Sequence, residues 1–422
     1  MKKTALAISL GLACLTSLNT YATTYLSAKA MVDVNSGKLI KSPLISIDNG
    51  QITAVQSNKQ PNLKDGDKHI QLLELTLVPG LMDMHVHLTS DPTVPRSERI
   101  GQSIPRKAIK AAHFAEKTLY AGFTTLRNLG AEGYSVIAVR DGINAGDIVG
   151  PRIWGAGPSL GVTGGHCDNN RLPPEMKYTA EGVADGPWAV RAKVRENIKY
   201  GANAIKFCAT GGVFSKGTKV GIQQYSQDEM NAIVDEAHLR GLTVAAHAHG
   251  TSGIKAAIVA GVDSVEHVSF VDDEAIKLAK KHGTWFSMDI YNTEYTLAFG
   301  EQNGVAEENL NKERQVSKKQ RDSFSRAVKA GVNMVFGTDA AIYPHGDNAK
   351  QFSRMVEFGM TPLQALQSAT INSAKLLKMD DQLGQIKSGF LADIIAVKGN
   401  PLENIAVLED VQFVMKDGKV FK

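Results

Sequence analysis

Two histidines at the end of an apolar segment are the first residues in this chain that could do chemistry. Residues 78–87 read VPGLMDMHVH, so that a Pro-Gly turn separates two apolar runs and the second run ends in His85 and His87. Side chains alternate along a β-strand, so the two imidazoles point to the same side, about 7 Å apart. Neutral imidazole is the commonest metal ligand, so the pair predicts half of a metal site. Two histidines that only pack in a loop are the alternative.

Other ligand-type residues follow glycines at a similar spacing. The spacing is five residues from Gly80 to His85 and from Gly201 to Lys206, six from Gly241 to His247 and from Gly261 to His267, and eight from Gly331 to Asp339. At about 3.3 Å per residue, five or six residues span roughly one strand of a barrel. The remaining histidines of the helices and outer loops, His69, His113, His238 and His282, lack this register and are interpreted as ordinary residues.

The elements that position these residues form a loose repeat, in which a helical segment ends at a glycine and an apolar strand follows. The glycines are Gly122, Gly150, Gly201, Gly241, Gly261, Gly283 and Gly331. Glycine in this place supplies the left-handed C-cap of a helix. Together with the strand that leads to His85, the repeat predicts eight strands, separated by amphipathic helices such as 108–120 and 228–240.

Alternating strands and helices pair in parallel, and eight such units predict an α/β fold of the (β/α)8 TIM barrel type over residues 79–378. Such a barrel holds its working residues at the C-terminal ends of its strands. A doubly wound open sheet is the alternative, but its dinucleotide-binding form needs a glycine-rich phosphate loop after the first strand, and this chain has none there.

Both ends of the chain contain short strands bounded by turn signals, at 29–34, 44–47, 52–55, 393–397 and 411–415. Short β segments need several partners to be stable. We therefore expect one small composite β-sandwich domain made from residues 23–78 plus 379–422.

The first 22 residues are typical of a secretory signal peptide. Met1-Lys2-Lys3 is a positive start, residues 5–15 are mostly apolar, and Thr20-Tyr21-Ala22 is a small-x-small cleavage signature. The apolar part is too short to span a bilayer. A lipoprotein modified at Cys14 is an alternative, although the residues before Cys14 fit a lipobox poorly. The mature chain is thus expected to be periplasmic or secreted, from a bacterium, and free of the membrane.

The composition adds little about partners. A net charge of +4 over 422 residues and the lack of a dense Lys/Arg cluster argue against a nucleic-acid partner. The remaining cysteines, Cys167 and Cys208, could form one bridge in an oxidising compartment or stay as two buried thiols, and the thiols are preferred. The sequence leaves open whether the chain forms a homo-oligomer.

As a set, the order HxH, Lys, His, His, Asp resembles the amidohydrolase superfamily of metal-dependent barrel hydrolases, over nearly the whole mature chain. The strings GFTTLR (122–127), IKFCATGG (205–212), AHAHG (246–250), HGDNA (345–349) and LADII (391–395) resemble a narrower branch. That branch holds Xaa-Pro dipeptidases, Lys/Arg-releasing carboxypeptidases and ochratoxin amidases, alongside imidazolonepropionase-like proteins.

The resemblance implies two divalent metal ions. The implied ligands are His85, His87 and Asp339 for the first ion, His247 and His267 for the second, and Lys206, carboxylated by carbon dioxide, as the bridge. An ammonium cannot ligate a cation, whereas a carbamate can, and burying an uncompensated ammonium is costly. A salt-bridged Lys206 beside a single metal is the alternative. Zn²⁺ is the first expectation, with manganese and cobalt as alternatives.

In that arrangement two metals would activate a water and polarise the scissile carbonyl. Asp339 would act as general base and then acid, unless it is only a capping residue. The expected substrate contacts are His166, Tyr225 and His249, where His166 could instead be an exposed loop residue and Tyr225 a packing residue before a helix. His249 competes with His247 as a ligand. Asp289, Tyr291 and Tyr295 are further expected lining residues.

The predicted function is an exported binuclear amidohydrolase that cleaves a peptide or amide bond of a small molecule. A dipeptidase of the Xaa-Pro or Xaa-Arg/Lys type, or a carboxypeptidase, is preferred. A cyclic-amide hydrolase similar to imidazolonepropionase and an N-acyl-amino-acid or ochratoxin amidase are the enzymatic alternatives. A periplasmic metal- or peptide-binding protein without turnover is the non-enzymatic one.

Overall fold

The computed structural model describes residues 22–422, without the side chains of residues 96 and 97. The predicted signal peptide therefore lies outside the described residues, except for Ala22.

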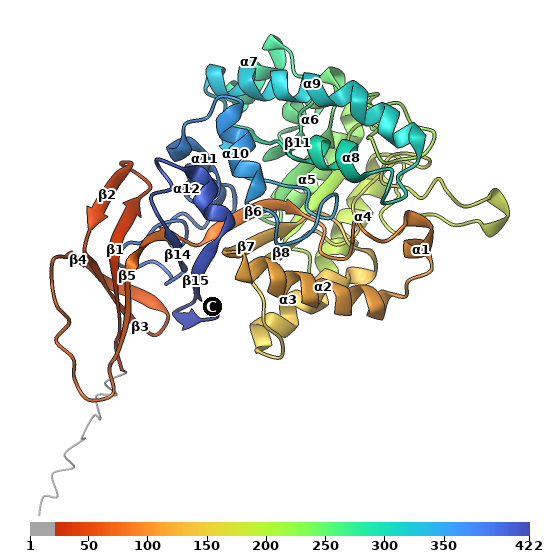
Figure 1. Ribbon diagram of the computed structural model, residues 1–422. Coiled ribbons are helices and arrows are strands. Elements are labelled where there is room, and N and C mark those ends of the chain that lie inside the picture. The colour runs from red at the N-terminus through yellow and green to blue at the C-terminus, as the bar shows by residue number, and fades with distance from the viewer. Residues whose placement is uncertain (1–21) are drawn as a thin grey trace, which may run out of the picture.

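Eight parallel strands form the middle of the chain, as the glycine repeat predicts (Figure 1). They are β6 (Leu81–Val86), β7 (Phe123–Asn128), β8 (Arg152–Gly155), β9 (Ala204–Cys208), β10 (Thr243–Ala248), β11 (Ser264–His267), β12 (Trp285–Ser287) and β13 (Met334–Val335). Strands β6 to β8 pair in sequence, and so do β9 to β13. Single contacts close the ring, since Leu160 N donates to Lys206 O at 2.8 Å and Met84 N donates to Phe336 O at 2.8 Å. The TIM barrel prediction is confirmed.

Helices surround the barrel and return the chain to the start of each next strand (Figure 1). They are α1 (Arg96–Ile100), α2 (Ile104–Tyr120), α3 (Ser135–Ala145), α4 (Pro187–Lys199), α5 (Gln227–His238), α6 (Thr251–Ala260), α7 (Asp273–His282), α8 (Asn292–Phe299), α9 (Glu307–Ala330), α10 (Lys350–Glu357), α11 (Pro362–Ser368) and α12 (Ile371–Leu376), with 3₁₀ turns at Glu132–Tyr134, Pro174–Met176 and Ile405–Glu409.

Glycine ends several of these helices as expected. Gly261, Gly283 and Gly331 are the left-handed C-caps of α6, α7 and α9, with φ of 93°, 71° and 68°. Gly150 does not have this role, because α3 already ends at Gly146, with φ of 84°. The strand after it was nevertheless predicted correctly.

Strands from both ends of the chain build one separate sheet (Figure 1). Its strands are β1 (Thr24–Asp33), β2 (Lys38–Lys41), β3 (Pro43–Asp48), β4 (Gln51–Ser57), β5 (Lys68–Pro79), β14 (Ile394–Lys398), β15 (Val411–Lys416) and β16 (Lys419–Val420). The order is β16-β15-β14-β5-β1-β3-β4, with β2 paired to β1, so that β5 and β14 join the two ends antiparallel. The sheet covers its own apolar core, which includes Leu26, Ile45 and Phe413. The predicted composite β domain is therefore present.

The sheet and the barrel are continuous, because only Gly80 separates β5 from β6. Within the described residues, no helix combines the length and the apolar character that a membrane crossing would need.

Candidate metal centre and active site

The first predicted ligand group comes together at the C-terminal end of β6. His85 Nε2 and His87 Nε2 lie 3.3 Å apart, and Asp339 Oδ1 lies 3.5 Å from the first and 3.3 Å from the second. Asp339 reaches this place from the turn after β13, where its amide donates to His85 O at 2.7 Å. Three donor atoms this close, two of them imidazole nitrogens, suit one divalent cation.

A second ligand group lies beside the first. Ligand atoms of His247, His249 and His267 lie within 4.8 Å of one another. The ring of His267 is 5.2 Å from that of His85, centroid to centroid, which joins the two groups. His247 Nε2 is buried and has no hydrogen-bond partner among the described residues, which fits the predicted role of His247 as a metal ligand. The group contains both His247 and His249, which competed for one role in the sequence interpretation.

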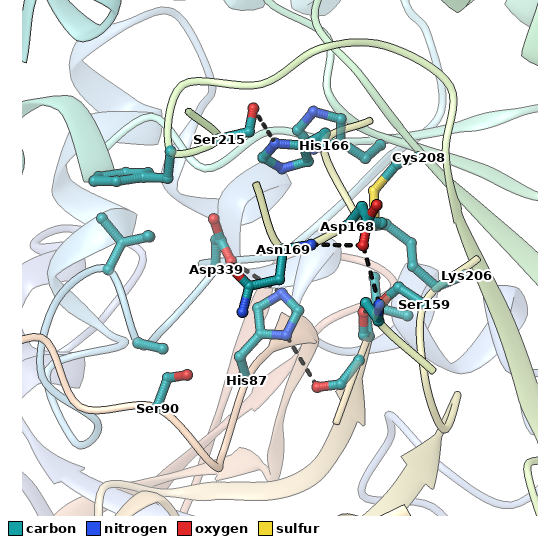
Figure 2. Close-up of a pocket in the computed structure, with 18 of the residues that line it drawn as sticks. His87, Ser90, Ser159, His166, Asp168, Asn169, Lys206, Cys208, Ser215 and Asp339 are labelled. Carbon is teal, nitrogen blue, oxygen red and sulfur yellow. Dashed lines mark hydrogen bonds and ion pairs between the residues drawn. A yellow bond between two sulfur atoms is a disulfide. The ribbon is translucent and has the colours of Figure 1, made fainter. Parts of the chain in front are cut away.

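Lys206 on β9 lines the same cavity as the histidines of both groups, and Figure 2 draws it in that cavity with His87 and Asp339. It is 3% exposed, and no ion pair or hydrogen bond of its ammonium group is found among the described residues. Burial lowers the pKa of Lys206 to about 8, against the opposing effect of Glu266 and Asp339. Its charge in turn lowers the pKa of His87 in the first group and of His249 in the second. A buried lysine with this placement fits the predicted bridging position.

The Nδ1 atom of most of these histidines lies beside an oxygen atom of a neighbouring residue. The pairs are His85 Nδ1 with Glu266 Oε2 at 3.1 Å, His87 Nδ1 with Gly130 O at 3.2 Å, His249 Nδ1 with Ser269 Oγ at 2.7 Å, and His267 Nδ1 with Asp289 Oδ1 at 2.9 Å. Such contacts set the tautomer and the ring orientation of a ligating histidine. Because the Nδ1 atoms make these contacts, the Nε2 atoms are the ones that can face a metal ion.

Glu266 and Arg127 are important residues that the sequence interpretation missed. Both side chains are fully buried, and Arg127 Nη2 donates to Glu266 Oε1 at 2.8 Å. Burial raises the pKa of Glu266, but Arg127 and His85 outweigh this and hold it well below its ordinary value. The sequence did contain a signal, because each is an ionisable residue inside an apolar strand, where a charge must be paired.

Two of the predicted ligands have an unusual backbone conformation. His267 and Asp339 have φ of 71° and 53°, in the left-handed region that residues other than glycine rarely adopt. His267 is the last residue of β11, and Asp339 comes four residues after β13, so both unusual φ angles lie where the chain leaves the C-terminal end of a barrel strand. Such conformations cluster at functional sites, where the surrounding structure holds them.

Asp339 also has the properties of a proton acceptor. Burial raises the pKa of its carboxyl to about 7; His267 lowers it and Asp289 raises it further. A carboxylate whose pKa lies near neutrality can accept a proton and release it again under ordinary conditions.

A cavity of about 490 Å³ opens above both ligand groups. Of the predicted substrate contacts, His166 and His249 line it, and His166 stacks on His247 with centroids 4.1 Å apart (Figure 2). Tyr225 is not brought to the cavity wall. Its ring is buried and its hydroxyl donates to Ala184 O at 3.1 Å, just before the capping box of α5.

Among the further lining residues that we expected, Asp289 faces this cavity, whereas Tyr291 and Tyr295 do not line it. Asp289 accepts from His267 and from Gln320 Nε2, the latter at 3.0 Å. It therefore contributes to the site by holding His267.

Cys167 and Cys208 form a disulfide at the edge of the cavity (Figure 2). The preference for two thiols was therefore wrong. Residues 41 positions apart meet because the loop after β8 folds back over the end of β9. Sequence spacing alone does not contain that contact.

Comparison with known proteins identifies the family of this chain. The model of the amidohydrolase family matches residues 76–421. An ochratoxinase of Aspergillus niger is 36% identical over 369 residues, which are 82% of this chain and 75% of that protein. The crystal structure of a Xaa-Pro dipeptidase with methionine in its active site has a TM-score of 0.88 and 40% identity, covering 95% of this chain and 100% of the other.

A prolidase solved with N-methylphosphonate-L-proline is similar to the same extent in fold, with a TM-score of 0.87, 32% identity and coverage of 95% of this chain and 100% of the other. The match of the family model extends over the barrel and the C-terminal strands, and it includes every predicted ligand. With this barrel, this composite sheet and this histidine–aspartate centre, the chain belongs to the amidohydrolase family.

Proposed function

We propose that this chain is an exported hydrolase that uses two divalent metal ions, Zn²⁺ in the first instance, to cleave the amide bond of a dipeptide or an N-acyl amino acid. One observation carries the proposal: two groups of ligand atoms and a buried lysine that forms no ion pair within 4.0 Å among the described residues line one cavity. A single metal would leave one of these groups without a cation.

The residues fit the two ions in a simple division. His85, His87 and Asp339 would hold one ion, and His247 and His267 the other, with His249 facing the substrate. A neutral Lys206 amine that adds carbon dioxide loses one proton and becomes a carbamate, which would bridge both ions. When bound, the two ions would polarise the scissile carbonyl and acidify a water.

The side chains of the protein supply the remaining steps. Asp339 would take the proton of the attacking water and pass it to the leaving nitrogen, so that the amine departs uncharged. His166 and His249, on the cavity wall, would contact the substrate. Asp289 would keep His267 in place through the contact of 2.9 Å between them.

The comparisons support this substrate class. A relative with methionine in its active site and one solved with a proline phosphonate act, by their names, on Xaa-Pro dipeptides. The ochratoxinase relative favours a second candidate, hydrolysis of an N-acyl amino acid such as ochratoxin. Imidazolonepropionase, at 23% identity, offers less support for a cyclic amide.

The decisive experiment is metal analysis of the mature protein together with turnover of dipeptides, N-acyl amino acids and ochratoxin. We expect about two ions per chain and hydrolysis of at least one substrate class. Lys206→Ala should lose metal and activity together. Full activity with fewer than two ions, or an active Lys206→Ala variant, would contradict the binuclear proposal.

Asp339→Asn separates an enzyme from a binding protein. An enzyme should lose about 10²- to 10⁴-fold in kcat when its proton acceptor is removed. A binding protein would show no turnover in the parent chain and unchanged peptide affinity in the variant.

Export is a separate part of the proposal. The disulfide supports it, since such bonds persist mainly in oxidising compartments. Sequencing the N-terminus of the protein from the periplasm or medium should begin near residue 23, and an intact Met1 in a cytosolic protein would contradict export.

A further inference from the structure

Two arginines line the cavity and are not directly paired with a carboxylate in the described part of the protein. Arg99 belongs to α1, in the connection after β6, and Arg171 to the loop after β8. Neither forms an ion pair within 4.0 Å, whereas Lys107, on the same cavity wall, pairs with Glu132.

Both guanidinium groups are fixed by neutral acceptors only. Arg99 Nε donates to Val94 O at 2.8 Å, and Arg171 Nη2 donates to Asn309 Oδ1 at 3.3 Å. Asn309 is itself held, because its Nδ2 donates to Val213 O at 2.6 Å. The side chains are therefore positioned, while the remaining N–H donors have no partner among the described residues.

The two guanidinium groups belong to the wall of one cavity, and the charge of one acts on the other. Burial lowers the pKa of Arg99, Asp91 raises it, and the charge of Arg171 lowers it again. Two half-buried cations that line one cavity repel each other and lose hydration, which costs free energy unless an anion joins them.

The nearby carboxylates are already occupied. Asp91 accepts from Thr93 and lies 3.7 Å from Lys110, and Glu308 accepts from Lys312 at 2.8 Å and from the amide of Gly217 at 3.0 Å. Other carboxylates of the cavity wall accept backbone amides, such as Asp168 from Gly164. These contacts leave the arginine pair for a ligand.

From this we propose that Arg99 and Arg171 together bind a carboxylate of the substrate and so select acidic over neutral amides. Guanidinium groups match a carboxylate with paired N–H donors and form charge-assisted hydrogen bonds. The inference rests on the proposed function and goes further, since it names the group recognised and the residues that recognise it. The carboxylate is either the C-terminal one or that of an acidic side chain.

Paired substrates test the proposal and separate the two sources. Gly-Phe, Met-Pro and N-acetylphenylalanine are each compared with their C-terminal amides, and Ala-Glu is compared with Ala-Gln. Both kcat/KM and affinity by calorimetry are measured, for the parent and for Arg99→Met, Arg171→Met and the double variant.

The parent should prefer the acid over its neutral partner in at least one pair by roughly 10- to 100-fold, and the double variant should lose most of that preference. In the double variant, kcat/KM and affinity should fall for the acid and stay unchanged for its neutral partner. A preference confined to the amide pairs identifies the C-terminal carboxylate, and one confined to Glu over Gln identifies the side chain. Arg99→Lys should keep only part of the preference, because lysine keeps the positive charge but lacks the paired N–H donors of the guanidinium group.

Lys216→Gln is the matched control, because it removes an equal charge from an exposed side chain on the same cavity wall. It should change the acid preference by no more than about 3-fold, since a solvated charge is well screened. Equal binding of acid and neutral partners by the parent, or an equal loss for both in the variants, would overturn the arginine proposal. Absence of any hydrolysis despite selective binding would instead contradict the proposed function and leave the arginine site standing.

Discussion

The carboxylate of Glu266 contacts two groups of different kinds. Arg127 Nη2 lies 2.8 Å from one of its oxygens and His85 Nδ1 lies 3.1 Å from the other. The first contact pairs two fully buried charges, and the second orients a predicted metal ligand. One residue thus joins the stability of the barrel interior to the geometry of the metal centre.

We predict that Glu266→Gln lowers both the stability of the protein and its affinity for metal. Breaking the buried pair should lower the free energy of unfolding of the metal-free protein by about 3–5 kcal/mol. Losing the anionic acceptor of His85 should lower metal affinity by about 10- to 100-fold. Denaturant unfolding and competition with a chelator measure the two effects.

Glu236→Gln is a suitable control for that variant. Glu236 on α5 is also buried, pairs with Arg195 at 2.8 Å and belongs to neither ligand group. It should lose stability and keep its metal affinity. If Glu266→Gln retains full metal affinity, the carboxylate does not orient His85 as described.

Glu313 on α9 makes stability depend on pH. It lines the cavity, forms no ion pair among the described residues and accepts a hydrogen bond from Thr293 Oγ1 at 2.6 Å. Burial raises its pKa from 4.5 to about 7. Between these values the folded chain binds a proton that the unfolded chain does not, so stability falls as pH rises through this window, by about 3 kcal/mol in total.

Glu313→Gln should remove this dependence, because the amide stays neutral. The variant and the parent should be similarly stable near pH 4.5, and the variant more stable by about 3 kcal/mol at pH 8. Urea unfolding at both pH values measures the difference. A difference that does not change with pH would exclude Glu313 as its source.

At the scale of elements, the disulfide fastens the loop after β8 to the end of β9. Cys167 follows His166 directly and precedes Arg171 by four residues, while Cys208 lies two residues beyond Lys206. The bond therefore ties residues of the cavity wall to the strand that carries the predicted bridging lysine.

We predict that the double variant Cys167→Ser with Cys208→Ser is less stable by about 4 kcal/mol, from the loop entropy of a 41-residue separation. The loosened loop should raise KM more than it lowers kcat, since it carries proposed substrate contacts and none of the predicted metal ligands. Steady-state kinetics and thermal unfolding, with and without reductant, test this. Reductant should affect the parent and leave the double variant unchanged.

The elements could be predicted from the sequence further than the side-chain contacts could. Apolar segments after glycines located all eight barrel strands, because burial in a parallel sheet demands continuous apolar residues and the helix C-caps demand glycine. The positive φ of His267 and Asp339, the Cys167–Cys208 bond and the position of Tyr225 depend on tertiary contacts. No local pattern contains these.

At the scale of the whole molecule, Arg152 connects the barrel to the composite sheet. It lies on β8, donates to Asp393 Oδ2 at 2.8 Å just before β14, and also pairs with Asp417 between β15 and β16. Asp393 is buried, so removal of Arg152 would leave a buried carboxylate without its ion-pair partner.

Arg152→Met should therefore destabilise both parts at once. We expect one unfolding transition, lowered by about 3 kcal/mol, because β5 and β6 are nearly continuous and Asp393 is left unpaired. Lys318→Met, which removes an exposed pair with Asp322 on α9, should change stability by less than about 1 kcal/mol. Calorimetry that resolved two separate transitions in Arg152→Met would show that the parts unfold independently.

The antiparallel pairing of β5 with β14 also affects how the chain is made. Pro79 pairs with Ile394, so 315 residues separate the two partners. At roughly 5–20 residues per second, a ribosome needs roughly 15–60 s to produce the second strand after the first. During that interval the apolar end of β5 presents an open hydrogen-bonding edge, which invites aggregation. A nascent chain of this protein therefore gives chaperones that recognise extended apolar segments a long period in which to bind.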